Sequence, residues 1–186
     1  MDLSTTLDAA RAGDDLAFAD IYRDLQPRLL RYASGLVGTD AEDITAEAWL
    51  QIARDVRGFE GAYDAFRGWA VRIVRNRALD HIRARGRRPA DPTDLQWVLD
   101  RADADDAWTM TAERISTREA IALIASLPRD QAEAVLLRTV VGLDAVTAAE
   151  ILGKRPGALR IAAHRGLKTL ADQLAPHGRH VASHRD

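Results

Sequence analysis

Cysteine is absent from the 186 residues of this chain. Its absence excludes structural disulfides, thiolate metal sites and thiol-based redox sensing within the chain. Aromatic residues are scarce, at 5% of the sequence, while alanine, leucine and arginine are plentiful. This composition favours helices over strands.

Long apolar runs are also missing. No stretch approaches the roughly 20 apolar residues that a membrane-spanning helix needs, and the N-terminal residues show no apolar leader pattern. Hydrophobic residues make up 47% of the chain and charged residues 29%, which is ordinary for a folded globular protein. We therefore expect a protein of the cytoplasm without membrane insertion.

The sequence shows none of the common catalytic motifs. It has no Gly-rich phosphate loop, no dinucleotide-binding glycine pattern and no H-E-x-x-H zinc motif. His177, His180 and His184 lie in a short polar segment after Pro176, which reads better as a disordered tail than as a metal site. We expect no catalytic residue, no metal and no cofactor.

The net charge of -2 conceals strong patterning along the chain. Residues 66–88 hold eight arginines against one acid, Asp80, and residues 154–168 hold five basic residues and no acid. Between these basic blocks, residues 89–113 hold six aspartates and Glu113 against one arginine. Two basic blocks separated by an acidic stretch indicate two contacts with nucleic acid. The alternative for each block is a solvated helix face.

Hydrophobic periodicity, glycine breaks and capping residues predict an all-α protein of two small helical domains joined by an acidic linker. Asp40 and Asp144 are the expected helix caps, and Gly142 and Gly153 the expected breaks. The helices are expected over 16–36, 40–56, 64 to the arginines before Pro89, 113–126, 128–141, 144–152 and 156–174. The predicted divisions are a first domain over 4–88, a linker over 89–112, a second domain over 113–175 and a disordered tail over 176–186.

Trp97 and Trp108 are unusual for a free linker. We expect both indole rings to pack on a neighbouring surface.

The last two predicted helices form a helix-turn-helix with its turn at Gly153. On the second of them, apolar and small residues cluster on one side and polar residues on the opposite side. A basic face with small apolar backing suits a recognition helix in the major groove, and the alternative is a surface helix of a bundle. The buried side is expected to hold Leu159, Ala162, Ala163, Gly166 and Leu170, and the exposed side Arg160, Ile161, His164, Arg165 and Lys168.

The helix that begins near Asp64 carries a second candidate face. Its members recur at helical spacing: Arg72, Arg75, Asn76, Leu79 and Arg83. Arginines hold phosphates, an asparagine can read a base edge, and Trp69 at the margin of the face can stack on an unpaired base. The other reading of Trp69 is an ordinary core residue.

A third face lies on the helix over 40–56, where Asp43, Glu47, Leu50 and Arg54 share one side. The opposite side is expected to be the core side. The pattern alone leaves open whether this face is merely solvated.

Taken together, these residues resemble the extracytoplasmic-function (ECF) sigma factors of the sigma-70 family over nearly the whole chain. Residues that resemble domain 2 of that family are Gly13-Asp14, Ala17-Phe18, Tyr22, Asp40 to Ile44, Phe66 to Trp69, Asn76-Arg77 and Asp80 to Arg83. Residues that resemble domain 4 are Leu127-Pro128, Val135 to Arg138, Gly142-Leu143, Ala149 to Gly153, Gly157 and His164-Arg165.

The resemblance implies a transcription initiation factor that binds core RNA polymerase, recognises promoter DNA and helps open it. It implies polymerase contacts by Asp43, Glu47 and Leu50, and minus-ten contacts by Trp69, Arg72, Arg75, Asn76 and Arg83. It implies minus-thirty-five contacts by Arg155, Arg160, Ile161, His164, Arg165 and Lys168. An anti-sigma protein is an implied partner, and the acidic linker corresponds to the family's segment in the polymerase's RNA path.

The recognition helix departs from the family pattern at its start. Arg155-Pro156-Gly157-Ala158 stands where the family commonly has Ser-x-Gly-Thr, and Ala158 lacks a hydroxyl often placed near phosphate. Ile161 and Ala162 replace residues that are commonly polar or basic. These departures concern individual minus-thirty-five contacts.

Two other functions are compatible with the residues alone. A stand-alone helix-turn-helix regulator would bind duplex DNA without polymerase. It would need neither a polymerase-docking face on the helix over 40–56 nor a DNA-opening helix after Asp64. A helical enzyme would use the arginines to hold an anionic substrate, but no acid-base or nucleophile set is visible in the sequence.

Overall fold

The computed structural model describes residues 3–86 and 116–175 of the chain. Within these two ranges every regular element is helical and no strand occurs. The expectations for the linker over 89–112, for Trp97 and Trp108 and for the tail over 176–186 concern residues outside the described ranges. The all-α fold class is confirmed.

The first group of helices comprises α1 (Leu3–Arg11), α2 (Asp15–Val37), α3 (Ala41–Asp55) and α4 (Tyr63–Gly86). Short 3-10 turns, Gly38–Asp40 and Val56–Gly58, flank α3. Helix α2 begins where the Asp14 carboxylate accepts hydrogen bonds from the amides of Leu16 and Ala17. Helix α1 had no counterpart among the helices expected from the sequence.

The core of this group lies where α2, α3 and α4 meet, with α1 packed against α2. Its largest fully buried side chains include Ile21, Leu25, Tyr32, Ile52 and Phe66. Burial of such side chains stabilises each by about 1.5–3 kcal/mol relative to exposure, so this core supplies the main stability of the group.

The second group comprises α6 (Thr117–Ala125), α7 (Arg129–Val135), the π-helical segment η5 (Leu136–Val141), α8 (Ala145–Leu152) and α9 (Pro156–Leu174). Ser116 and Glu119 form a capping box at the start of α6. Gly142, with φ of 81°, ends η5 in the left-handed conformation that glycine adopts without strain. These local signals place the group's turns close to where the sequence predicted them.

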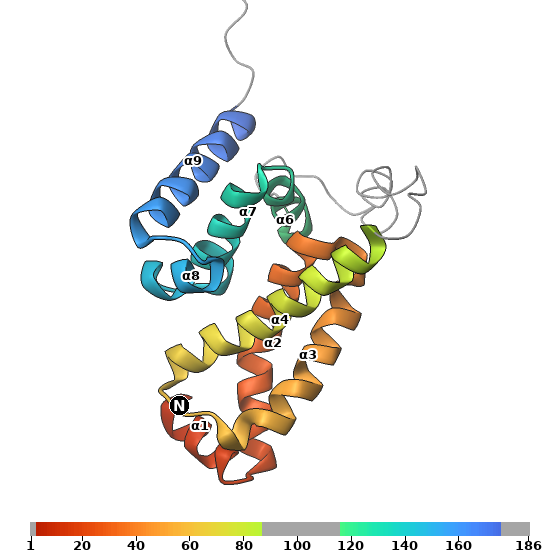
Figure 1. Cartoon of the computed structure of the whole chain (residues 1–186), viewed down its shortest axis with the longest axis vertical. Coiled ribbons are helices and arrows are strands. Elements are labelled where there is room, and N and C mark those ends of the chain that lie inside the picture. The colour runs from red at the N-terminus through yellow and green to blue at the C-terminus, as the bar shows by residue number, and fades with distance from the viewer. Residues whose placement is uncertain (1–2, 87–115, 176–186) are drawn as a thin grey trace, which may run out of the picture.

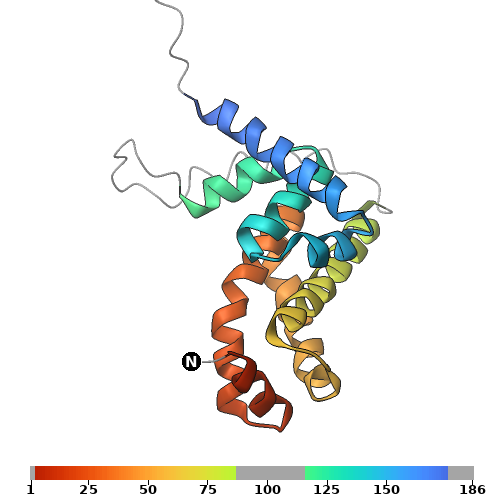
Figure 2. The ribbon, with the colours of Figure 1, turned by 90° about the vertical axis from the view of Figure 1, so that its left-hand side faces the viewer.

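The two groups contact each other. Figure 1 shows α6–α9 gathered beside α2 and α4, with α1 at the far end of the first group, and Figure 2 shows the same arrangement from the side. Helix α2 packs on η5 and α6, and α4 packs on α8. The chain is therefore folded so that its second domain rests on the helices of the first.

Candidate nucleic-acid interface

Helix α4 presents a polar face to solvent. The side chains of Arg72, Asn76 and Arg83 are exposed, and Arg83 pairs with Asp80 one turn earlier, at 2.8 Å. On the other side of the helix, Ala70, Val71, Ile73, Val74 and Ala78 are buried. The expected division of this helix into a core side and a polar side is confirmed.

Arg75 differs from its neighbours on that face. Its Nε donates to Oε2 of Glu133 on α7 at 2.8 Å, and only 19% of the Arg75 side chain is exposed. The sequence grouped Arg75 with the accessible arginines, but the structure turns it toward the second domain. This difference arises because the side chain of Arg75 pairs with a residue of another helix. The spacing of residues along α4 gives no information about such tertiary contacts.

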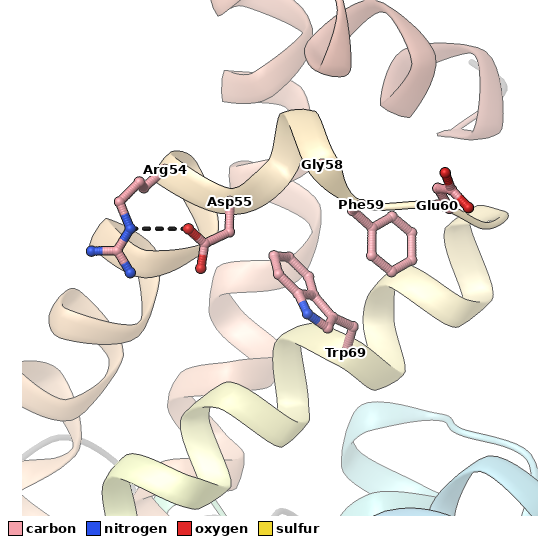
Figure 3. Close-up of a pocket in the computed structure, with 6 residues that line it drawn as sticks. All are labelled: Arg54, Asp55, Gly58, Phe59, Glu60 and Trp69. Carbon is pink, nitrogen blue, oxygen red and sulfur yellow. Dashed lines mark hydrogen bonds and ion pairs between the residues drawn. The ribbon is translucent and has the colours of Figure 1, made fainter.

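Trp69 lies at the margin of the face and is half-buried. Its ring packs on Phe66 at 5.4 Å and on Phe59 at 5.2 Å between ring centroids. Trp69 and Phe59 line an open hollow of about 530 Å³ together with Arg54, Asp55, Gly58 and Glu60. Figure 3 shows these six residues, with the rings of Trp69 and Phe59 next to each other. The ring thus contributes to the packing of the first domain while part of it borders a solvent-accessible hollow.

Phe59 was not among the residues singled out from the sequence. It follows the 3-10 turn Val56–Gly58, and its carbonyl accepts a 2.7 Å hydrogen bond from Nε of Arg11 on α1. The guanidinium of Arg11 also lies 5.8 Å from the centre of the Phe59 ring. An aromatic residue in a glycine-flanked loop was the available signal, and its partner on α1 could not be read from the sequence.

Helix α3 carries the expected two faces. Ala41, Thr45, Ala48, Ile52 and Val56 are buried, as the sequence predicted. Asp43, Glu47 and Leu50 are exposed, and Leu50 is 74% exposed, which folding of this domain alone does not require. Glu47 also pairs with Arg77 of α4 at 2.9 Å.

Asp40 does not cap α3 through its side chain, so that expectation is wrong. Its Oδ2 accepts instead from Nη1 of Arg85 at 2.5 Å and lies 2.8 Å from Nε2 of His81. The carboxylate therefore ties the start of α3 to the end of α4, because charged partners on α4 compete successfully with the backbone amides.

The helix-turn-helix formed by α8 and α9 is confirmed. The Asp144 carboxylate accepts from the amides of Val146 and Thr147 at the start of α8, and Gly153 ends the helix in the left-handed conformation. Hydrogen bonds from the hydroxyl and amide of Thr147 lower the pKa of Asp144. Helix α9 then begins at Pro156, whose missing donor costs nothing at a helix start.

Helix α9 buries one side against α7 and α8. Leu159, Ala163, Gly166 and Leu170 are buried, and Ala162 is half-buried. A Cβ atom added at Gly166 would lie 2.8 Å from Cγ2 of Val135, so glycine permits the close approach of α7 and α9. The opposite face of α9 is exposed, and its residues, with Arg155 before the helix, are those singled out from the sequence: Arg155, Arg160, Ile161, His164, Arg165 and Lys168.

Ile161 stands out on this face because 55% of its side chain is exposed. An apolar side chain among cations suits contact with a thymine methyl group as well as with the apolar edge of a groove. The structure thus places each of the predicted minus-thirty-five residues on one accessible surface of the second domain.

Within residues 3–86 and 116–175, no group of three or more His, Asp or Glu side chains could hold a metal ion. The tail histidines at 177, 180 and 184 lie outside these ranges. No helix in the described part of the chain is long and apolar enough to cross a membrane.

Comparison with known proteins matches both helical groups to one family. The family described as "Sigma-70 region 2" matches residues 21–88, and the family described as "Sigma-70, region 4" matches residues 117–170. The chain is 33% identical over 172 residues to the ECF RNA polymerase sigma factor SigE of Mycolicibacterium smegmatis, covering 88% of this chain and 63% of that protein. It is 29% identical over 185 residues to the ECF RNA polymerase sigma factor SigD of Mycobacterium tuberculosis, covering 95% of this chain and 85% of that protein.

Solved structures of similar fold extend over most of the chain. The sigma factor RpoE of Bartonella quintana, solved with the anti-sigma factor NepR, has a TM-score of 0.64 at 21% identity, covering 86% of this chain and 98% of that one. CnrH, solved with the cytosolic domain of CnrY, has a TM-score of 0.63 at 20% identity, covering 93% of this chain and 97% of that one. These likenesses show that the arrangement of helices is a known one.

Proposed function

This chain belongs to the sigma-70 family, as an ECF sigma factor and thus a transcription initiation factor, and from this premise we propose how its exposed faces divide the work. The first domain, over 4–88, docks on core RNA polymerase and recognises and opens the minus-ten element. The second domain, over 113–175, reads the minus-thirty-five element. The match of both domains to sigma-70 regions favours this function over a stand-alone helix-turn-helix regulator.

The observation that carries the proposal is the accessible face of α9 on a helix-turn-helix whose opposite face is buried. Arg160 lies near the N-terminal end of α9, the end that enters the major groove in this motif. A guanidinium at this place can make a bidentate contact with guanine. Arg165 and Lys168 lie farther along, where the phosphates of the groove wall run.

On α4, the exposed side chains of Arg72 and Arg83 supply phosphate contacts, and Asn76 reads a base edge. Trp69, beside an open hollow, offers a stacking surface for a base that has left the duplex. Arg75 joins this set only when it is released from Glu133.

The exposed Asp43, Glu47 and Leu50 form the polymerase-docking face on α3. An exposed leucine flanked by two carboxylates suits a partner surface that is apolar at its centre and basic at its edge. Because such a subunit only positions DNA and polymerase, the protein makes and breaks no bonds itself, and polymerase supplies the active site.

We place this activity in the cytoplasm, with core polymerase and promoter DNA as partners and an anti-sigma protein as a regulator. Of the two structural relatives, RpoE was solved with the anti-sigma factor NepR, and CnrH was solved with the cytosolic domain of CnrY. The acidic segment over 89–112 is proposed to follow the polymerase's RNA path, where its negative charge imitates RNA.

A run-off transcription assay with core polymerase tests the function. A promoter-dependent transcript that requires this protein is the expected result. Duplex binding without any transcript would instead support the stand-alone regulator, and neither binding nor transcript would reopen the question of an enzyme.

A further inference from the structure

Ile161 is the exposed residue of α9 that points most directly away from the core of the second domain. The buried stripe of this helix consists of Leu159, Ala163, Gly166 and Leu170. At 100° per residue, Ile161 lies about 170° around the helix from the middle of that stripe. Folding of the domain does not require an apolar side chain at this place, yet an isoleucine stands there and is 55% exposed.

The cations of α9 surround this isoleucine. Around the helix, Lys168 lies about 20° from Ile161 and Arg165 about 40°, while Arg160 directly precedes it in the chain. In the described part of the chain, no carboxylate pairs with any of these three side chains, and residues 154–168 contain no acid. An apolar protein surface would bury these cations without a partner, whereas a polyanion would neutralise them. The charge around Ile161 therefore favours nucleic acid as the partner that covers it.

The start of α9, in front of Ile161, is free of bulky side chains. Gly157 lies one turn earlier and about 40° from Ile161 around the helix, and Ala158 is exposed. A Cβ atom added at Gly157 would lie in open space. The backbone of α9 can thus approach DNA closely at this end, and a side chain as short as isoleucine reaches a base edge only when the backbone comes close.

An apolar side chain recognises one feature of the major groove. Thymine alone among the four bases of unmodified DNA presents a methyl group there, on its C5 atom, and apolar side chains pack on it. The edges of guanine and adenine carry hydrogen-bonding groups, which Ile161 would remove from water without replacing their partners. Pro156, Gly157 and Ala158 supply no hydrogen-bonding side chain in its place. The chemistry of this position therefore favours thymine.

Given the proposed function, we propose that Ile161 is a specificity-determining residue that selects a thymine in the minus-thirty-five element by contact with its C5-methyl group. The neighbouring cations hold phosphates and supply affinity for any sequence, and Arg160 reads a guanine. Ile161 adds preference for one further base pair. Promoters that this protein uses consequently carry an A·T pair at that position of the element.

Uracil in place of thymine tests the contact, because the two bases differ only in the C5-methyl group. The probe is duplex promoter DNA whose minus-thirty-five element has first been enriched from random sequence by wild-type holoenzyme. Each thymine of that element is replaced by uracil, one at a time, and binding of holoenzyme is measured. At one position we expect the Kd to rise about three- to fivefold, the loss expected when one buried methyl group is removed.

Variants of the protein connect this effect to Ile161. Ile161→Asn removes the apolar surface, so this variant should bind thymine and uracil DNA equally well, whereas Ile161→Val keeps a branched apolar side chain and should still discriminate. Leu167→Ala is the matched control, because Leu167 is also exposed on α9, at 46%, but lies about 9 Å farther along the axis. It should discriminate as wild type does. All three positions of substitution are exposed, so thermal unfolding should stay close to that of wild type.

The possible outcomes distinguish this inference from the proposed function. If wild-type holoenzyme tolerated uracil at every position, or if the uracil effect persisted in Ile161→Asn, the methyl contact would be overturned while the role of the second domain stood. A loss of binding in Ile161→Asn that was accompanied by no uracil effect in wild type would likewise overturn it. If wild-type holoenzyme enriched no minus-thirty-five sequence at all, the proposed reading of this element would itself fail, and the inference with it.

Discussion

We predict that replacing either of two arginines of α9 with alanine changes promoter binding, and that the two substitutions do so in different ways. Arg160 is the fifth residue of the helix and Arg165 the tenth. At 1.5 Å and 100° per residue, they lie about 7.5 Å apart along the axis and about 140° apart around it. Arg160 therefore faces the groove floor when the N-terminal end of α9 enters the groove, and Arg165 faces a wall.

The magnitudes follow from these places. Arg160→Ala should weaken promoter binding by about 1–3 kcal/mol, roughly 5- to 150-fold in Kd, and relax preference at one or two minus-thirty-five positions. Arg165→Ala should weaken binding to all DNA sequences alike. It should also lower the slope of log binding constant against log salt concentration by about one, because one phosphate contact, and so one released counterion, is lost. Both side chains are exposed, so stability should change by less than about 0.5 kcal/mol.

The assay is a selection of minus-thirty-five sequences by holoenzyme carrying each variant, combined with binding at several salt concentrations. Gln173→Ala, also exposed but near the end of α9, is the control and should behave as wild type. If Arg160→Ala retained the wild-type sequence preference, α9 would not enter the groove as described. Ala158 and Ile161, which depart from the family pattern, would then be the first positions to examine.

Three further predictions concern the other faces and the helix caps. Asn76→Ala in holoenzyme should lower the permanganate reactivity of the minus-ten thymines more than it lowers closed-complex formation. The reason is that base contacts give sequence specificity, whereas phosphate contacts position the protein on the DNA. Equal losses at both steps would make Asn76 a structural residue. Glu47→Arg should abolish pull-down of core polymerase, and it should lower the free energy of unfolding by about 1 kcal/mol because the pair with Arg77 is lost. Glu42→Arg, which is exposed on another side of α3, should retain polymerase binding. Wild-type affinity of the Glu47 variant for polymerase would remove this face from the proposal. Asp144→Ala should cost about 1 kcal/mol in thermal unfolding at neutral pH. Because the pKa of Asp144 is lowered on folding, its contribution is complete above its ordinary pKa of 3.8 and disappears as the pH falls through the lower folded value, so the variant and wild type should converge in acid; a constant difference down to low pH would contradict the cap.

Local signals were enough to place most helices. The cap at Asp144, the breaks at Gly142 and Gly153 and the start at Pro156 occur where the sequence predicted them. Each depends on a backbone conformation or hydrogen bond within a few residues, so each can be read without knowledge of the rest of the molecule. The same holds for the buried and exposed sides of α3 and α9.

The candidate faces were predictable to the same extent. Helical spacing grouped the exposed residues of α9 correctly, since a residue's place around a helix depends only on its position in the chain. Spacing could not reveal that Phe59 joins Trp69 at the hollow, because these residues belong to different elements. Nor could it reveal α1, whose short pattern gains its stability by packing on α2.

The sequence by itself thus determined the helical class, the order of the helices and the side of each that meets a core, because periodicity and capping are properties of neighbouring residues. Only the tertiary structure decided the partners of charges that more than one group could satisfy. Asp40 joins α4 instead of capping α3, and Arg75 joins Glu133 instead of solvent. Such pairings depend on which surfaces approach closely enough to exclude water, and that is settled by the packing of whole helices.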